Sequence, residues 1–252
     1  MRVAASARRS AGEAVVLGLL GAALGGGLGW SLQPWVGAAM AVAAGVNGAL
    51  SGWRQVYAWR TLWGLVAFVL DSTWALLPVT AGLVMHAVAF AARAPGFEPS
   101  LSRRQNRHVY RGGAFLQRGF ALTLGNVISS AGDVSRARRR KLITDHEAVH
   151  VWQARAFGPA YLVLYLLWSV GGAVAGLVVW LLRRRREPLG KVVESCSYYL
   201  NPFEWWAYSR DDLWPPPGLL PGIGWRQPAA RPLVAVRALR RARSEADRRG
   251  AG

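Results

Sequence analysis

Residues 146 to 150 read His-Glu-Ala-Val-His, and this pattern indicates chemistry more directly than any other in the chain. Positions i and i+4 lie on one face of a helix, so the imidazoles of His146 and His150 can bind one cation. Glu147 between them can take a proton from a water bound to that cation. The spacing therefore predicts a Zn²⁺ site with hydrolytic chemistry.

A catalytic zinc site needs a third protein ligand and leaves one position open for water. Glu204 is the first candidate, because Asn201-Pro202 can begin a helix that carries Glu204 in its first turn. Glu187 and Glu194 are rival candidates that lie in less regular sequence.

The order of these motifs resembles that of the gluzincin metallopeptidases, in particular the membrane-embedded branch that includes the CAAX-processing and heat-shock membrane proteases. That branch carries a downstream Glu-x-x-Ala-Asp, and Glu204-Trp-Trp-Ala207 matches its first four positions. Tyr208 stands where the branch has an aspartate that steadies a ligand histidine. By the order of the motifs, the resemblance covers residues 108 to 212.

The resemblance implies that His146, His150 and Glu204 hold Zn²⁺. It also implies that Glu147 is the general base in the hydrolysis of a peptide bond, and that other residues stabilise the oxyanion or orient a ligand. Spacing does not choose among the candidates for these last roles, which are His108, Tyr198, Tyr199, Tyr208, Asp145, Asp211 and Asp212.

Two short runs before the histidine motif predict strands. Residues 108 to 116 and 120 to 128 are rich in aromatic and β-branched residues and contain glycines, which favours two or three strands in hairpins. Strands before a HExxH helix are also what the resemblance implies, with the last strand offering an edge to a peptide substrate. The candidate edge consists of Leu124, Gly125, Asn126, Val127 and Ile128. We expect the HExxH helix itself over residues 136 to 157.

Long uncharged runs predict membrane segments in a chain that is 52% hydrophobic and 17% charged. Residues 14 to 53 carry no charge and are long enough for two crossings with a turn at Gln33-Pro34. A third apolar region, residues 61 to 92, contains Asp71. We expect residues 61 to 70 to lie as an interfacial helix, with Asp71 capping the next helix.

The choice of Glu204 places a constraint on the apolar residues 158 to 182. The polar blocks 94–156 and 187–212 must share one membrane face if Glu204 joins the histidines, so the run between them cannot cross once. Because it is also too short for two full crossings, we expect a re-entrant hairpin that turns at Gly171-Gly172. A single straight helix here would exclude Glu204.

The formal charge of +18 permits a nucleic-acid partner, but the composition does not favour one. All basic residues except Lys141 and Lys191 are arginines, which suggests a composition bias as much as selection for a ligand. Basic clusters at 138–141 and 183–186 lie beside apolar runs, where they fit lipids of an anionic leaflet and favour a cytoplasmic position for the polar blocks.

The sequence thus predicts a mainly α membrane protein, with multi-pass helices and a small α+β zincin-like module at the membrane surface. Residues 1–92 form the N-terminal transmembrane region and 93–212 the module. Residues 213–252 are a Pro-rich linker and a basic tail, which either lies as an amphipathic helix on lipid or is disordered.

The predicted function is that of a zinc-dependent membrane metallopeptidase, which hydrolyses peptide bonds of membrane or membrane-proximal proteins. We expect it in a prokaryotic plasma membrane, with the catalytic module facing the cytoplasm. The alternative is a catalytically inactive scaffold or pseudo-protease that binds lipid or a protein partner.

Overall fold

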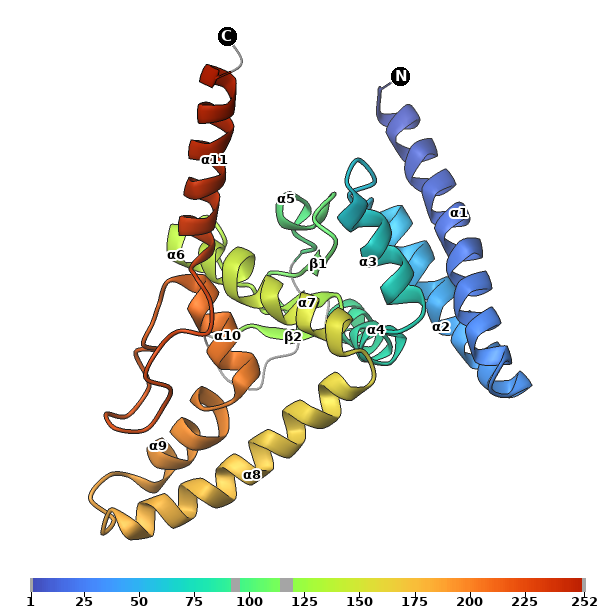
Figure 1. Ribbon diagram of the computed structural model, residues 1–252. Helices are drawn as coiled ribbons and strands as arrows, with labels where there is room; N and C mark the ends of the chain where they lie inside the picture. The colour runs from blue at the N-terminus through green and yellow to red at the C-terminus, as the bar shows by residue number, and fades with distance from the viewer. Residues whose placement is uncertain (1, 92–95, 114–119, 251–252) are drawn as a thin grey trace. The chain divides into compact units, whose positions relative to one another are not determined.

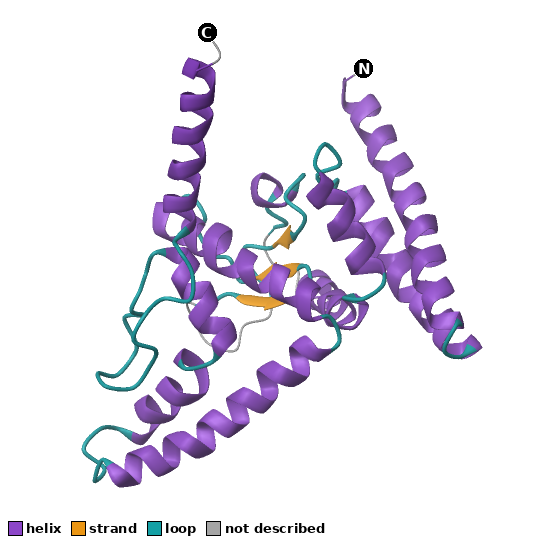
Figure 2. Cartoon of the chain, viewed as in Figure 1, coloured by secondary structure: helices purple, strands orange, loops and turns teal. Residues whose placement is uncertain are grey.

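A computed structural model describes residues 2–91, 96–113 and 120–250. The chain is mainly helical with one small sheet, as the sequence predicts (Figures 1 and 2). It divides into two compact units, Met1–Leu162 and Val163–Gly252, and helix α8 contains the boundary.

The first unit holds most of the elements, and the second holds most of α8 and the C-terminal helices. In chain order the elements are α1 (Arg2–Trp30), α2 (Pro34–Trp53), α3 (Leu62–Ser72), α4 (Leu76–Ala91), α5 (Pro99–Ser102), β1 (His108–Val109), β2 (Leu122–Leu124), β3 (Val127–Ser129), α6 (Ala137–Lys141), π-helix η1 (Leu142–Glu147), α7 (Ala148–Phe157), α8 (Ala160–Leu182), α9 (Leu189–Glu194), π-helix η2 (Ser195–Tyr199), α10 (Pro202–Asp211) and α11 (Leu233–Gly250). The basic tail is therefore helical over Leu233–Gly250.

Among the described residues, three helical segments are long and apolar enough to span a membrane, namely Ala7–Trp30, Pro34–Trp53 and Ala160–Leu182. The first two form the expected hairpin, with Gln33 preceding α2 and Pro34 at its start. The pair α3 and α4 passes the same test of length and composition, but it is bent by 87° at the break between them. These findings are consistent with a membrane protein that has three or four spans.

Asp71 does not cap the helix that follows it. It lies in the last turn of α3, and the break comes after Ser72. Its carboxylate is buried and forms a bidentate ion pair with Arg155 of α7, with Nε and Nη2 each 2.8 Å from an oxygen. The expectation was wrong because a buried carboxylate is stabilised far better by a guanidinium than by helix N–H groups alone.

A polar network surrounds this ion pair. The Oδ2 atom of Asp71 also accepts hydrogen bonds from Tyr57 Oη at 2.9 Å and Asn126 Nδ2 at 3.2 Å. Asn126 donates in addition to Asn47 of α2, and Arg155 donates to the backbone carbonyl of Asn106. One carboxylate therefore connects α3, α7 and the turn between β2 and β3.

The sheet has the strand order β1-β3-β2, with β1 parallel and β2 antiparallel to β3. Alternate residues of β3 face opposite sides, as the period of a strand requires. Val127 packs against Met85 and Ala89 of α4, while Ile128 lies in a cluster with Ile143 and Val151 from η1 and α7. The sheet thus lies between α4 and the HExxH helix (Figure 2). The end of the first predicted run, residues 114–116, lies outside the described residues.

The re-entrant hairpin expected at residues 158–182 is wrong, because α8 continues as one helix through Gly171-Gly172. The glycines instead allow a close approach. A Cβ atom on Gly172 would lie 2.5 Å from the carbonyl oxygen of Cys196, and one on Gly176 would lie 2.8 Å from Cα of Val193. The chain turns back after α8, and α9 and η2 pack along the face that these small residues provide.

Replacing Arg155 with alanine should lower the free energy of unfolding by about 3–5 kcal/mol, because it leaves the Asp71 carboxylate buried without its counter-charge. Thermal unfolding of the purified protein in detergent measures this loss. Arg104→Ala is the matched control, since the Arg104–Glu13 pair is partly exposed, and it should change stability by no more than about 1 kcal/mol. Equal losses in the two variants would contradict the role given to the buried pair.

Candidate metal centre

The two histidines of the HExxH motif turn their side chains toward one point. His146 lies in η1 and His150 in α7, and their Nε2 atoms are 3.2 Å apart. Two nitrogens bound to one tetrahedral zinc at 2.0–2.1 Å would lie about 3.3–3.4 Å apart. The described geometry therefore fits a shared cation with little movement of either ring. Both side chains are buried.

Gln153 orients one of these rings. Its Oε1 lies 2.8 Å from Nδ1 of His150, and Oη of Tyr161 lies 3.4 Å from the same nitrogen. When Oε1 accepts a hydrogen bond from Nδ1–H, the neutral imidazole has its lone pair on Nε2, where it is available to a cation. Gln153 stands one helical turn after His150, and its side chain is almost fully buried.

Glu147 is buried beside the histidines and is held by the sheet. Its Oε2 accepts a hydrogen bond of 2.6 Å from Oγ1 of Thr123 in β2. The strand that lies closest to the general-base candidate is therefore β2. Because α6, η1 and α7 follow each other without a break, the helix predicted over residues 136 to 157 is present, although it includes a π-helical turn at the motif.

The candidate edge of residues 124 to 128 is wrong at Val127 and Ile128, because only Leu124 of the five lies in the outer strand β2. Leu124 pairs with Val127 across a two-residue turn of Gly125 and Asn126, and Val127 and Ile128 lie in the central strand. Gly125 has a φ of 54°, and a Cβ atom there would lie 2.4 Å from the carbonyl oxygen of Pro78, so the turn needs glycine. The outer strand next to the motif is β2, which pairs only with β3 in the described part of the chain.

Glu204 lies in the second unit, where the predicted helix begins at Pro202 and carries Glu204 in its first turn. The side chain of Asn201 accepts from the backbone N–H of Phe203 at 3.0 Å and caps this helix. Glu204 is buried, and its Oε1 accepts a hydrogen bond of 2.8 Å from Oη of Tyr165 in α8. The chain after α8 thus folds back along that helix, so that Glu204 lies beside its second turn.

This return removes the objection that a straight α8 would exclude Glu204. That objection assumed that the chain, after crossing once as a straight helix, would stay on the far face of the membrane. In the structure the ring of Phe203 stacks on that of Tyr165, with centroids 6.0 Å apart, so residues 203 and 204 lie beside the beginning of α8 rather than its end.

Three buried side chains, His146, His150 and Glu204, form a group that could hold a metal ion, and no other such group of three occurs among the described residues. Two imidazoles and one carboxylate are a ligand set typical of catalytic zinc sites, which keep a fourth position for water.

The tyrosine candidates lie near Glu204 in the second unit. Tyr198 and Tyr208 approach with their hydroxyl oxygens 3.4 Å apart, and the ring of Tyr199 packs against both. Burial, followed by the charge of Glu204, raises the pKa of Tyr198 well above its usual value. The Tyr198 hydroxyl therefore keeps its proton and remains a hydrogen-bond donor across the physiological pH range.

The structure places His108 in a different cluster. Its Nε2 lies 3.0 Å from Oγ of Ser51, and its ring contacts that of His86 with centroids 4.5 Å apart. His108 is fully buried in β1, and none of these contacts is with the HExxH histidines. The arrangement does not support His108 as the residue that stabilises an oxyanion.

Of the three aspartates that are candidates to orient a ligand, two are buried. Asp145 is buried in η1, where it accepts from Oγ1 of Thr144 at 3.0 Å, and Asp211 is buried at the end of α10. Asp212 follows α10 as its C-cap in the left-handed conformation. The rival ligands Glu187 and Glu194 form ion pairs with Arg183 and Lys191.

Sequence reasoning missed Thr123, Gln153 and Tyr165, which contact the three candidate functional residues Glu147, His150 and Glu204. Gln153 could have been found from its position three residues after His150 on the same helix. Two of these contacts could not be predicted from a local sequence pattern. Thr123 and Glu147 are 24 positions apart, and Tyr165 and Glu204 are 39 positions apart.

Comparisons of the chain with protein-family models, curated proteins and solved structures found no match. The assignment of the site therefore rests on its own residues and geometry.

Replacing Gln153 with leucine should weaken Zn²⁺ binding about 10- to 100-fold, because leucine offers no acceptor oxygen to Nδ1 of His150 and no longer fixes the orientation of that ring. Competition against a fluorescent chelator measures the affinity. Gln153→Glu is the control, since it keeps an acceptor oxygen and should retain the cation. Wild-type affinity in Gln153→Leu would show that Gln153 does not position the ligand.

His108 should make stability depend on pH. Burial, and after it the charge of His86, hold the pKa of His108 well below its ordinary value of 6.5. As the pH falls below about 6.5, the unfolded chain gains a proton that the folded chain does not. The free energy of unfolding should therefore decrease by up to about 1.4 kcal/mol per pH unit.

Unfolding by denaturant at pH 7, 6 and 5, measured with a chelator present, tests this dependence of the free energy of unfolding on pH. The slope should be smaller in His108→Asn, which cannot take up the proton. The same slope in both proteins would assign the pH dependence to other groups.

Proposed function

We propose that the protein is a zinc-dependent membrane metallopeptidase that hydrolyses peptide bonds in membrane or membrane-proximal proteins. The observation that carries this proposal is the convergence of His146 and His150, whose Nε2 atoms lie 3.2 Å apart beside a buried Glu147. The helical spans and the resemblance to membrane-embedded gluzincins support a substrate at the membrane.

His146, His150 and Glu204 are the proposed Zn²⁺ ligands. The fit is supported by the separation of the two nitrogens, by the acceptor that Gln153 offers to His150, and by the burial of all three ligands. Without a cation, one imidazole can share a proton with the other across 3.2 Å, and a bound cation replaces that proton. In that state both rings are neutral ligands.

The proposed chemistry is hydrolysis with Glu147 as the general base. A bound Zn²⁺ would polarise the scissile carbonyl and lower the pKa of its water toward about 7. Glu147 takes a proton from the attacking water and passes it to the leaving amine nitrogen, so that the carboxylate is regenerated. Thr123 holds one oxygen of Glu147 by a hydrogen bond, which fixes the direction of the other.

Two further parts of the site are proposed from their positions. The outer strand β2 carries Thr123 and is unpaired on one side within the described residues, so an extended peptide can add to it beside Glu147. Tyr198 and Tyr208 are the proposed donors to the oxyanion, because His108 is held in another cluster and Tyr165 is engaged by Glu204.

Metal analysis and turnover of four variants beside the wild type test the proposal. The wild type should bind about one Zn²⁺ per chain, and His150→Ala and Glu204→Gln should lose most of it. Glu147→Gln should keep Zn²⁺ and lose turnover of a quenched fluorescent peptide library by at least about 100-fold. Glu194→Gln is the matched control, because this rival carboxylate pairs with Lys191 and should change neither quantity.

The outcomes distinguish the alternatives. Zinc in Glu204→Gln equal to that of the wild type would remove Glu204 from the ligand set. Zinc without turnover in the wild type would favour the inactive scaffold, and no zinc in the wild type would refute the proposed function.

A further inference from the structure

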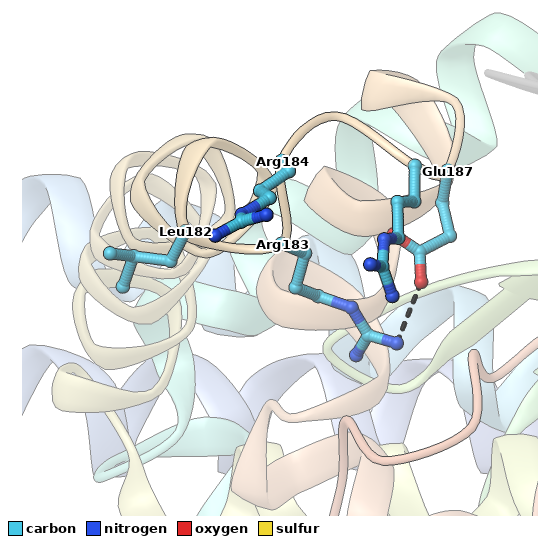
Figure 3. A pocket seen from close by; sticks show the side chains of 5 residues that line it. Leu182, Arg183, Arg184 and Glu187 are labelled. Atoms are coloured by element: carbon cyan, nitrogen blue, oxygen red, sulfur yellow. Dashed lines mark ion pairs between the residues drawn. The ribbon is translucent and has the colours of Figure 1, made fainter.

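The end of α8 carries a basic hollow that the proposed peptidase does not use. Its volume is about 270 Å³, and it is lined by Leu182, Arg183, Arg184, Arg186 and Glu187 (Figure 3). We propose that this hollow binds the phosphate of an anionic glycerophospholipid headgroup.

The helix places the hollow at the depth of a headgroup. Helix α8 has the highest hydropathy among the candidate spans, and only 6% of its most apolar window is buried within the protein. The exposed leucines and valines of α8 continue to Leu182, its last residue, and the arginines follow immediately. At 1.5 Å per helical residue, a guanidinium one or two residues beyond the lipid-facing apolar surface lies beside the phosphates. Trp180, whose ring stacks under Arg185, is of a type enriched at this level.

Two arginines are available for a ligand. Arg183 is engaged, since it forms an ion pair of 2.6 Å with Glu187 and donates to the carbonyl oxygen of Pro221. Figure 3 shows Arg183 and Glu187 directed toward each other across the hollow. Arg184 and Arg186 also line it, and within the described chain their guanidinium groups have no hydrogen-bond or ion-pair partner. Guanidinium is the side chain best suited to a phosphate, because its donors form a fork.

The backbone holds the arginines in an unusual conformation. Arg184 and Arg185 both have φ in the left-handed region, at 55° and 57°, where glycine or asparagine is normally preferred. Their N–H groups donate to the carbonyl oxygens of Leu181 and Trp180, which keeps these oxygens from facing an anion in the hollow.

The carboxylate of Glu187 favours a headgroup that carries a hydrogen-bond donor beside its phosphate. One carboxylate oxygen is paired with Arg183, and the other, Oε2, is buried without a hydrogen-bond partner. A headgroup that adds a hydroxyl donor to its phosphate can satisfy both the arginines and Oε2, which phosphatidylglycerol does and phosphatidylcholine does not.

Native mass spectrometry of the full chain in an uncharged detergent tests the site with phosphatidylglycerol and phosphatidylcholine of matched acyl chains. The wild type should bind phosphatidylglycerol in preference. Arg184→Ala with Arg186→Ala should weaken that binding about 30-fold, the loss expected for two arginines at an anionic surface, and should leave phosphatidylcholine unchanged. Arg184→Lys with Arg186→Lys should recover part of the affinity, because charge is kept but the fork is lost.

The matched control is Arg60→Ala with Arg103→Ala, which removes the same charge from exposed positions in the first unit and should leave phosphatidylglycerol binding unchanged. An equal loss in this control, or wild-type binding in the Arg184/Arg186 alanine variant, would overturn the proposal. Displacement of the lipid by an excess of inorganic phosphate would show that the hollow takes free phosphate instead. Because zinc content is not part of the readout, the result does not depend on the proposed peptidase activity.

Discussion

The buried ion pair between Asp71 and Arg155 is the constraint on which the arrangement of the first unit depends. A carboxylate and a guanidinium removed from water must meet in good geometry, because either charge left alone would cost several kcal/mol. Asp71 also accepts from Asn126 in the turn of the sheet, so one carboxylate fixes both the HExxH helix and the strands beside it. Arg155 lies about 140° around the helix from His150, so this anchor leaves the histidine face free.

The features that follow from local pattern were predicted from the sequence. The hairpin of α1 and α2, the helix over residues 136 to 157 and the helix that begins at Pro202 depend on uncharged length, i/i+4 spacing and an N-terminal proline. Each of these signals lies within one continuous stretch of chain, the longest being the uncharged residues 14 to 53.

The predictions that were wrong concern residues whose contacts are distant in sequence. Asp71 finds Arg155 84 residues later, and a pattern confined to its neighbourhood indicates only a helix cap. Gly171-Gly172 can serve a turn or a close helix contact, and the choice depends on the small-residue face that α9 and η2 cover. Val127 and Ile128 are β-branched residues that suit an outer strand as well as a central one. Their strand, β3, is central because β1 pairs with one side of it and β2 with the other.

The central claim is that two imidazoles and a carboxylate of this chain bind Zn²⁺. X-ray absorption at the zinc edge of the purified full chain tests it most directly, because the spectrum reports the ligand atoms themselves. We predict nitrogen and oxygen ligands at about 2.0–2.1 Å, with scattering from two imidazole rings. A zinc–sulfur distance of about 2.3 Å, which would implicate the single cysteine Cys196, or a shell without imidazole would contradict the account.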